Sequence, residues 1–137
     1  MKYSLSHISL FAGLSPEERK NIEDFCQEKI LGEGEYLFRE GDEPQAIYIV
    51  TSGSFSIYKG EDKKELAIVE RGELLGEMAF FGEEKERNAS IVAREDSEVL
   101  VLLAFSIAQL FGKYPELHEK LQDIIHARQE ENKNKGF

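Results

Sequence analysis

The sequence predicts a mainly β domain flanked by helices, and three observations lead to that class. Between residues 29 and 104, short runs rich in β-branched and aromatic residues alternate with glycine-containing turns, which is typical of a sandwich or barrel. A helix-start pattern precedes these runs at residues 15–18, and an apolar stripe with helical spacing follows them at residues 117–125. The length of 137 residues suits one domain with its own hydrophobic core, over residues 1–137.

The first predicted helix begins at a capping box. Ser15 has a side chain that can cap the helix, Pro16 takes the first helical position, and Glu18 can bond back to the cap. We expect this helix to run to about Gln27. Its predicted buried face consists of Ile22, Phe25 and Cys26.

The middle of the chain is predicted to form short strands. The apolar run over residues 46–51 suits a largely buried position, because β-branched and aromatic side chains favour strands. Gly34, Gly41 and Gly53 mark the turns between strands. The expected strands cover residues 36–39, 46–51, 55–58, 66–69, 89–93 and 99–103.

Two helices are predicted after the last strand. The first is short, over residues 105–111, and Tyr114-Pro115 breaks it. Pro115 then begins a longer helix, whose apolar stripe consists of Leu117, Leu121, Ile124 and Ile125. Beyond Arg128 the chain is polar, and we expect this tail to fray.

The stretch from Leu74 to Ala93 carries the residues best suited to hold a ligand. Gly76 lets a ligand approach the backbone closely, because it has no Cβ atom. A helical turn is expected over residues 77–81, and its first N–H groups favour an anion. After a charged loop, the guanidinium of Arg87 can take a phosphate through paired hydrogen bonds. The carboxylate of Glu77 suits a sugar hydroxyl beside that phosphate.

These residues resemble the phosphate-binding cassette of the cyclic nucleotide-binding domain family. The similarity lies in Gly-Glu-Met-Ala-Phe-Phe at residues 76–81 and Arg-Asn-Ala-Ser-Ile-Val-Ala at residues 87–93. Residues 34–42 and 46–55 are similar to the β-roll of the same family. The resemblance implies a double-stranded β-helix, a jelly-roll-like fold as in cyclic AMP receptor-type regulators. Such a fold has an N-terminal helix, a short cassette helix and C-terminal helices.

The resemblance also implies roles for individual residues. Glu77 is expected to bind the ribose 2′-hydroxyl, and Arg87 the cyclic phosphate. Asn88 departs from the hydroxyl or alanine that the family usually has after the arginine; its amide can still donate to a phosphate. The missing hydroxyl tilts the expectation slightly toward cyclic AMP over cyclic GMP. The expected ligand-binding residues are Gly76, Glu77, Met78, Arg87, Asn88 and Ala89.

The family organisation divides the chain into three parts. A helical lead-in covers residues 1–28, the β-roll covers 29–104 with its cassette at 74–93, and C-terminal helices cover 105–132. The resemblance implies that a bound nucleotide moves the last helix and so signals to an effector protein, whose identity the sequence does not indicate. No DNA-binding segment follows that helix, so we expect a stand-alone regulatory sensor if this is the whole gene product.

Other interpretations of these residues stay open. Glu83, Glu84 and Glu86 can pair with Arg87 on a solvated loop for little energy, and the chain is then a degenerate β-roll that binds a protein without nucleotide. Alternatively, the site takes another small anion. The apolar residues of 114–125 keep a heptad spacing for about two heptads, which allows a homodimer.

The composition disfavours several further classes of function. A net charge of −10 repels nucleic-acid backbones and anionic membranes, so neither is an expected partner. The longest apolar run, over residues 99–105, is too short to span a bilayer. Cys26 is the only cysteine, which precludes an intramolecular disulfide and suits a cytoplasmic protein. His7, His118 and His126 lie in no catalytic or metal-binding motif, so we expect no enzyme activity, metal or cofactor.

Overall fold

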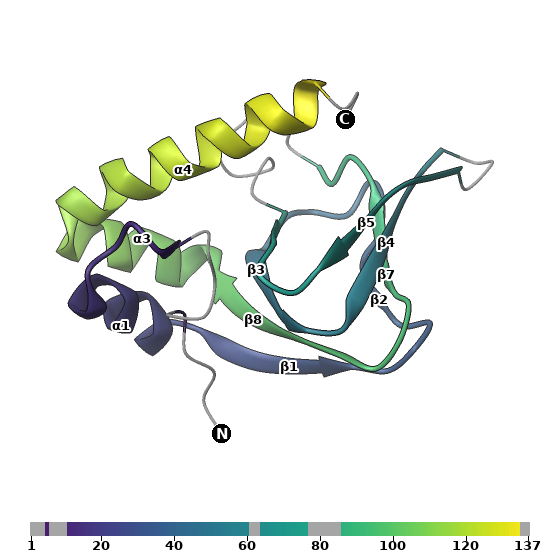
Figure 1. Ribbon diagram of the computed structural model, residues 1–137, viewed down its shortest axis with the longest axis horizontal. Helices are drawn as coiled ribbons and strands as arrows, with labels where there is room; N and C mark the ends of the chain where they lie inside the picture. The colour runs from purple at the N-terminus through teal and green to yellow at the C-terminus, as the bar shows by residue number, and fades with distance from the viewer. Residues whose placement is uncertain (1–4, 6–10, 61–63, 77–85, 135–137) are drawn as a thin grey trace.

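In the part of the chain that the structure describes, the protein folds into a β-roll with α1 and α3 at one end and α4 running from that end across the roll (Figure 1). The structure is a computed structural model, and it describes residues 5, 11–60, 64–76 and 86–134. The helices are α1 (Pro16–Asp24), α3 (Ala104–Lys113) and α4 (Pro115–Asn134). The strands are β1 (Gln27–Leu31), β2 (Tyr36–Phe38), β3 (Ala46–Ser52), β4 (Ser54–Lys59), β5 (Lys64–Glu70), β6 (Leu74–Leu75), β7 (Ser90–Ala93) and β8 (Ser97–Leu103).

The strands form two antiparallel four-stranded sheets. One sheet has the order β1-β8-β3-β6 and the other has the order β2-β7-β4-β5. Strands that are neighbours in a sheet are often far apart in the sequence, as when β1 pairs with β8 from Gln27–Val101 to Leu31–Ser97. This arrangement confirms the predicted mainly β class with flanking helices.

Strands β3 and β8 are buried on both faces. Side chains of a strand alternate between its faces, so one face of β3 and β8 meets the helices and the other meets the second sheet. Both strands therefore have nearly continuous apolar sequences, as expected for strands without a solvated face. The helix-facing residues are Ile47, Ile49, Leu100 and Leu102. The residues that face the roll interior are Ala46, Val50, Val99 and Val101.

Helix α1 begins as predicted and ends earlier. Ser15 and Glu18 form the reciprocal capping box, with Glu18 N–H donating to Ser15 Oγ at 3.1 Å. The prediction that the helix runs to about Gln27 is wrong, because Asp24 is its last residue and Phe25 caps it. Gln27 instead begins β1, where pairing with β8 overrides the helical pattern. Ile22 is fully buried, while Phe25 and Cys26 are partly buried against the same cluster from beyond the helix end.

The C-terminal helices also differ from the prediction in their length. Tyr114 separates α3 from α4, as expected from Tyr114-Pro115. The tail beyond Arg128 does not fray at that point, because α4 continues to Asn134. Residues 129–134 include good helix formers and neither glycine nor proline, so nothing in their sequence interrupts the helix.

Helix α4 packs on the rest of this chain through its apolar stripe. Leu117 and Leu121 are buried in the same cluster as Ile22 and Leu110, which come from α1 and α3. Lys120 Nζ adds a 2.9 Å hydrogen bond to Glu18 Oε1, in the capping box of α1. Two residues of the stripe that the sequence offered for a homodimer are therefore covered within one chain. The side chains of Ile124 and Ile125 lie outside the described part.

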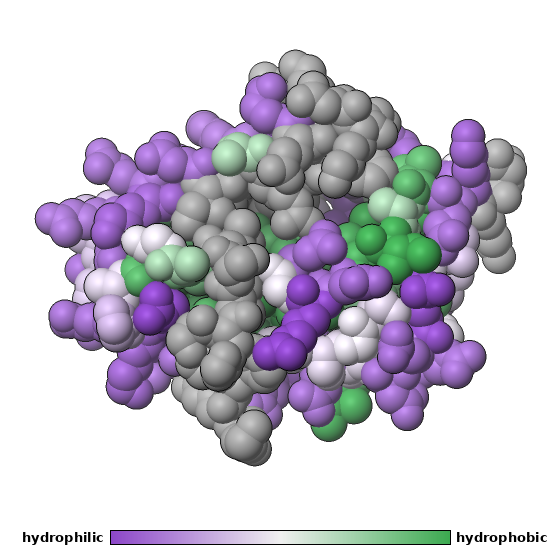
Figure 2. Space-filling view, viewed as in Figure 1, coloured by the Kyte–Doolittle hydropathy of each residue, from purple (hydrophilic) through white to green (hydrophobic). Residues whose placement is uncertain are grey.

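The described surface is mostly hydrophilic in the face shown by Figure 2, in keeping with a net charge of −10. A hydrophobic area interrupts it in the part of the view that β4 and β5 occupy. Within the described ranges, no helix combines the length and hydropathy that a membrane crossing requires.

Candidate ligand site

Gly76 and Arg87 lie next to each other in the structure, as the sequence suggested. Gly76 follows directly after β6 and has a φ of +82°, a left-handed conformation that favours glycine. A Cβ atom at this position would lie 2.7 Å from Nη1 of Arg87. Glycine is therefore required here both for its backbone conformation and for the space that the guanidinium occupies.

The side chain of Arg87 is buried, with 4% of its surface exposed. Its Nη1 donates a hydrogen bond to the carbonyl of Gly76 at 2.9 Å, and its Nη2 donates to the carbonyl of Ala46 at 2.6 Å. These bonds join the end of β6 to the start of β3 through one guanidinium. Burial of a charge is costly unless hydrogen bonds compensate for it, so this arginine is held by the fold rather than displayed on a solvated loop.

The backbone of Arg87 is fixed as firmly as its side chain. Its N–H donates to the carbonyl of Asp42 at 2.8 Å, and its carbonyl accepts from the N–H of Gly41, also at 2.8 Å. Residues 41–42 belong to the turn after β2, so that turn and the segment before β7 support each other. The position of the guanidinium is thus set by three parts of the roll.

Among the described residues, two aromatic rings lie near the guanidinium. Cζ of Arg87 is 4.1 Å from the ring centroid of Phe38 and 5.8 Å from that of Tyr48. The two rings contact each other with centroids 5.8 Å apart and planes tilted by 31°. The sequence pattern did not indicate Phe38, Tyr48 or Ala46 as parts of the site. Their types are ordinary for buried strands, and their contacts with Arg87 span about forty to fifty residues of chain.

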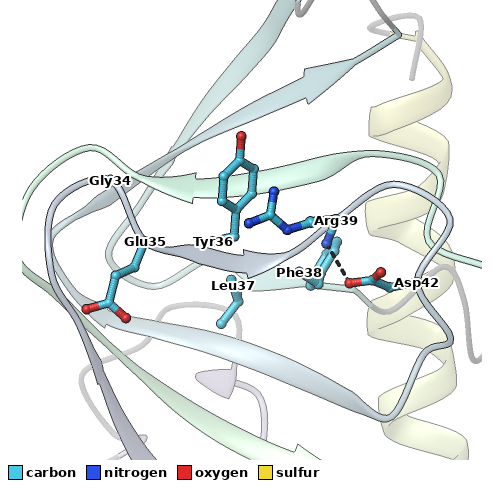
Figure 3. Close-up of a pocket in the computed structure, with 7 residues that line it drawn as sticks. All are labelled: Gly34, Glu35, Tyr36, Leu37, Phe38, Arg39 and Asp42. Atoms are coloured by element: carbon cyan, nitrogen blue, oxygen red, sulfur yellow. Dashed lines mark hydrogen bonds between the residues drawn. The ribbon is translucent and has the colours of Figure 1, made fainter.

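A hollow of about 490 Å³ lies along β2 and the adjoining turns. Figure 3 shows the Tyr36 ring and the Arg39 guanidinium side by side, with Leu37 directed to the opposite side of the strand. Cζ of Arg39 is 3.7 Å from the Tyr36 centroid, and the N–H of Arg39 donates to Asp42 Oδ2 at 2.9 Å. The residues that line the hollow are Gly34, Glu35, Tyr36, Leu37, Phe38, Arg39 and Asp42. Phe38 therefore belongs both to this hollow and to the surroundings of Arg87.

Of the other predicted site residues, the structure describes Asn88 and Ala89. Ala89 is buried and Asn88 is half-buried, directly after Arg87. Glu77 and Met78 lie outside the described residues, as does the helical turn expected over residues 77–81.

The competing interpretation placed Arg87 among carboxylates on a solvated loop. Of those carboxylates, Glu83 and Glu84 lie outside the described residues, and Glu86 is exposed. The burial of Arg87 contradicts the solvated setting that this interpretation assumed. Across the described residues, His, Cys, Asp and Glu side chains form no group of three that is arranged to hold a metal ion.

The chain is similar to known proteins in sequence and in fold. A family model described as the cyclic nucleotide-binding domain matches residues 28–114. The cyclic AMP receptor protein of Thermus thermophilus is 35% identical over 122 residues, which is 87% of this chain and 56% of that protein. The cGMP-dependent protein kinase egl-4 of Caenorhabditis briggsae is 31% identical over 124 residues, covering 87% of this chain and 16% of that protein.

Solved structures give the same picture. The crystal structure of the Thermus thermophilus catabolite activator protein aligns with a TM-score of 0.77 and 35% identity, over 90% of this chain and 59% of that one. A structure of PKAR CBD2 bound to Sp-2Cl-cAMPS aligns with a TM-score of 0.79 and 27% identity, over 96% of this chain and 83% of that one. The chain thus spans little more than half of the Thermus thermophilus proteins that it matches.

Proposed function

This chain belongs to the cyclic nucleotide-binding domain family, and we propose that it is a regulatory module that binds a cyclic nucleoside monophosphate. In this proposal Arg87 takes the cyclic phosphate and Glu77 takes the ribose 2′-hydroxyl. Gly76, Met78, Asn88 and Ala89 complete the ligand contacts. The module acts by binding and performs no catalysis.

The observation that carries the proposal is the buried guanidinium of Arg87 beside Gly76. A guanidinium fixed by backbone carbonyls is already oriented before the ligand arrives, so little side-chain entropy is lost on binding. Gly76 leaves room for this guanidinium, because a Cβ atom there would lie 2.7 Å from Nη1. An overall net charge of −10 opposes the approach of an anion, so a local cation is needed to bind one.

Calorimetric titration with cyclic AMP, and with cyclic GMP for comparison, tests the proposal. We expect saturable binding of a single ligand per chain. Arg87→Ala should weaken it by at least about tenfold, since charge-assisted hydrogen bonds contribute roughly 1.5–3 kcal/mol each. Arg39→Ala is the matched control, because it removes the same charge from an exposed side chain beside the hollow.

The outcome also decides between this proposal and its alternatives. Equal losses in Arg87→Ala and Arg39→Ala would indicate general charge attraction rather than a phosphate site. Binding of neither nucleotide, with no thermal stabilisation, would favour a roll that binds a protein or another small anion.

The base preference is a finer part of the proposal. Asn88 supplies no hydroxyl after the arginine, and this favours cyclic AMP. Relatives named for cyclic AMP and for cGMP both match this chain, so their names do not choose between the two. Asn88→Thr adds a hydroxyl at this position. The ratio of cyclic GMP to cyclic AMP affinity should therefore rise in this variant, and an unchanged ratio would assign base selection to other residues.

For the proposed relay to the C-terminal helices, we infer a route through backbone hydrogen bonds. The carbonyl of Ala46 accepts from Arg87, and the preceding carbonyl, of Gln45, accepts from the N–H of Ala104 at 2.9 Å. Ala104 is the first residue of α3. The neighbouring carbonyls of Gln45 and Ala46 therefore connect Arg87, the proposed phosphate-binding residue, to the start of α3. A phosphate that shifts Arg87 relative to Ala46 would alter this connection. In this proposal the roll binds the ligand, and the C-terminal helices respond to it.

The effector protein and the oligomeric state belong to the same proposal. Leu117 and Leu121 are buried inside the chain, so a homodimer through residues 114–125 would have to use other side chains of that segment. Light scattering with and without cyclic nucleotide measures the oligomeric state directly, and a monomer under both conditions would refute the homodimer.

A further inference from the structure

Phe38 connects the buried arginine with the open hollow. Its ring lies 4.1 Å from Cζ of Arg87, closer than the Tyr48 ring at 5.8 Å, and the same residue lines the hollow along β2. Figure 3 shows Phe38 following Leu37 on β2, ahead of the turn that contains Asp42. That turn in turn bonds to the backbone of Arg87. Both the ring and its strand are therefore tied to the arginine.

The contacts of Arg87 constrain different directions. The hydrogen bonds to Gly76 and Ala46 lie along N–H bonds of a planar group, so they fix the guanidinium within its own plane. They do not support its faces. The Phe38 ring, 4.1 Å from Cζ, restrains movement of the guanidinium toward it and attracts the cation through its quadrupole, an attraction that is larger when the cation is desolvated.

We propose that Phe38 is a positioning residue of the ligand site, whose ring contacts the Arg87 guanidinium and keeps its N–H groups in the orientation a phosphate requires. This inference rests on the proposed function, and it adds a residue that neither the cassette motif nor its spacing includes. Phe38 acts through Arg87 and does not itself contact the phosphate.

Three substitutions separate positioning from packing. Phe38→Leu keeps an apolar side chain in contact with the roll interior but removes the ring. Phe38→Tyr keeps the ring. Tyr36→Leu removes a ring from the same strand that stacks on Arg39 instead of Arg87, and it serves as the matched control.

Affinity for cyclic AMP is the first measurement. We expect Phe38→Leu to weaken it by about 3- to 30-fold, the range given by a partly or fully desolvated cation–π contact. Phe38→Tyr and Tyr36→Leu should stay close to the wild type. Equal weakening in Phe38→Leu and Phe38→Tyr would overturn the positioning role, because the ring would then not matter.

A measurement without nucleotide keeps the two proposals separable. NMR of the Arg87 side chain in the ligand-free protein reports how fast its guanidinium rotates about the Nε–Cζ bond. We expect faster rotation in Phe38→Leu, and rotation as slow as in the wild type in Phe38→Tyr and Tyr36→Leu. Unchanged rotation in Phe38→Leu would refute the positioning role. A wild-type chain that binds neither nucleotide would refute the proposed function, whatever the rotation rate.

Discussion

The two faces of the β1-β8-β3-β6 sheet support cores of different character. On one face, α1, α3 and α4 pack in a cluster whose buried side chains, among the described residues, are all apolar. On the other face lies the interior of the roll. The buried polar residues of the described part all come from the roll, and they are Thr51, Ser54, Ser56, Arg87 and Ser97.

The two cores differ in the kind of contact that holds them. Hydrogen bonds are directional, so the roll is held in one register by contacts such as Ser54 N–H to Ser97 Oγ at 3.1 Å. Apolar contacts are not directional, so helices can slide on the sheet at a smaller cost. Arg87 thus lies on the side of the sheet with buried polar contacts, and α4 packs on the side with an apolar cluster. This contrast supports the proposed relay, in which the roll binds and the helices respond.

The largest expected effect comes from opening a cavity in either core. Phe55 is fully buried in the roll, and Phe55→Ala should lower the free energy of unfolding by about 3–5 kcal/mol. Leu117 has 1% of its surface exposed in the helical cluster, and Leu117→Ala should cost about 2–5 kcal/mol. Urea denaturation measures both. Only the roll variant should also weaken nucleotide binding, so equal affinity losses would show that the two cores are not separable.

The next effect tests the side of the sheet that carries the site. Gly76→Ala forces an L side chain into a left-handed conformation, at about 1–2 kcal/mol, and also displaces Nη1 of Arg87. We expect a loss of both stability and nucleotide affinity. Gly34→Ala is the control, because Gly34 has a φ of +87° and a Cβ there has no neighbour within 4 Å. Denaturation should show a loss in both variants, larger for Gly76→Ala because Nη1 is also displaced, and titration should show a large affinity loss for Gly76→Ala alone.

A smaller effect tests the connection between the two sides. Ala104→Pro removes the N–H that donates to Gln45, and proline suits the first position of α3. Leu103, with φ −68° and ψ 150°, already has a conformation that is allowed before proline. The stability loss should be about 0.5–1.5 kcal/mol, as for one hydrogen bond.

Hydrogen exchange of α3 and α4 with and without cyclic AMP provides the decisive measurement for this connection. In the wild type we expect the ligand to change exchange in these helices. Ala104→Pro should bind the ligand yet lose most of that change, whereas Ala104→Ser, which keeps the N–H, should retain it. A full response in the proline variant would exclude this hydrogen bond as the route.

The smallest expected effect concerns the contact of α4 with α1. The Ser15 N–H, and after it the Lys120 ammonium, hold the pKa of Glu18 below its ordinary 4.5. A carboxyl with a lowered folded pKa stabilises the protein above its unfolded pKa, and this stabilisation is lost as the pH falls through the folded value.

A double-mutant cycle of Glu18→Gln and Lys120→Met isolates this pair. Lys120 is half-exposed, so we expect a coupling of about 0.2–1 kcal/mol at pH 7. Denaturation at a series of pH values should show the coupling decline below the ordinary pKa of 4.5 and disappear as the pH falls through the lowered folded pKa of Glu18. A coupling that persists in acid would mean that the pair is not ionic.

Several features were predictable because neighbouring residues produce them. The capping box at Ser15 and Glu18 was correct, since its hydrogen bonds join residues three apart. The break at Tyr114-Pro115 was correct for the same reason. The end of α1 was not, because pairing of Gln27 with the distant Val101 decided it. The continued helix after Arg128 was missed because polarity was weighed above helix propensity.

The sequence by itself determined the class of fold and the residue types of the cassette, because strand alternation, turn glycines and the Gly76-to-Arg87 motif are local patterns. Only the tertiary structure decided how Arg87 is held. Within the described residues, its side-chain acceptors come from residues 11 and 41 positions away, and the nearer of two rings comes from Phe38 on β2. The physical reason is that burial and hydrogen-bond direction depend on which strands become neighbours, and the closure of the roll sets that arrangement.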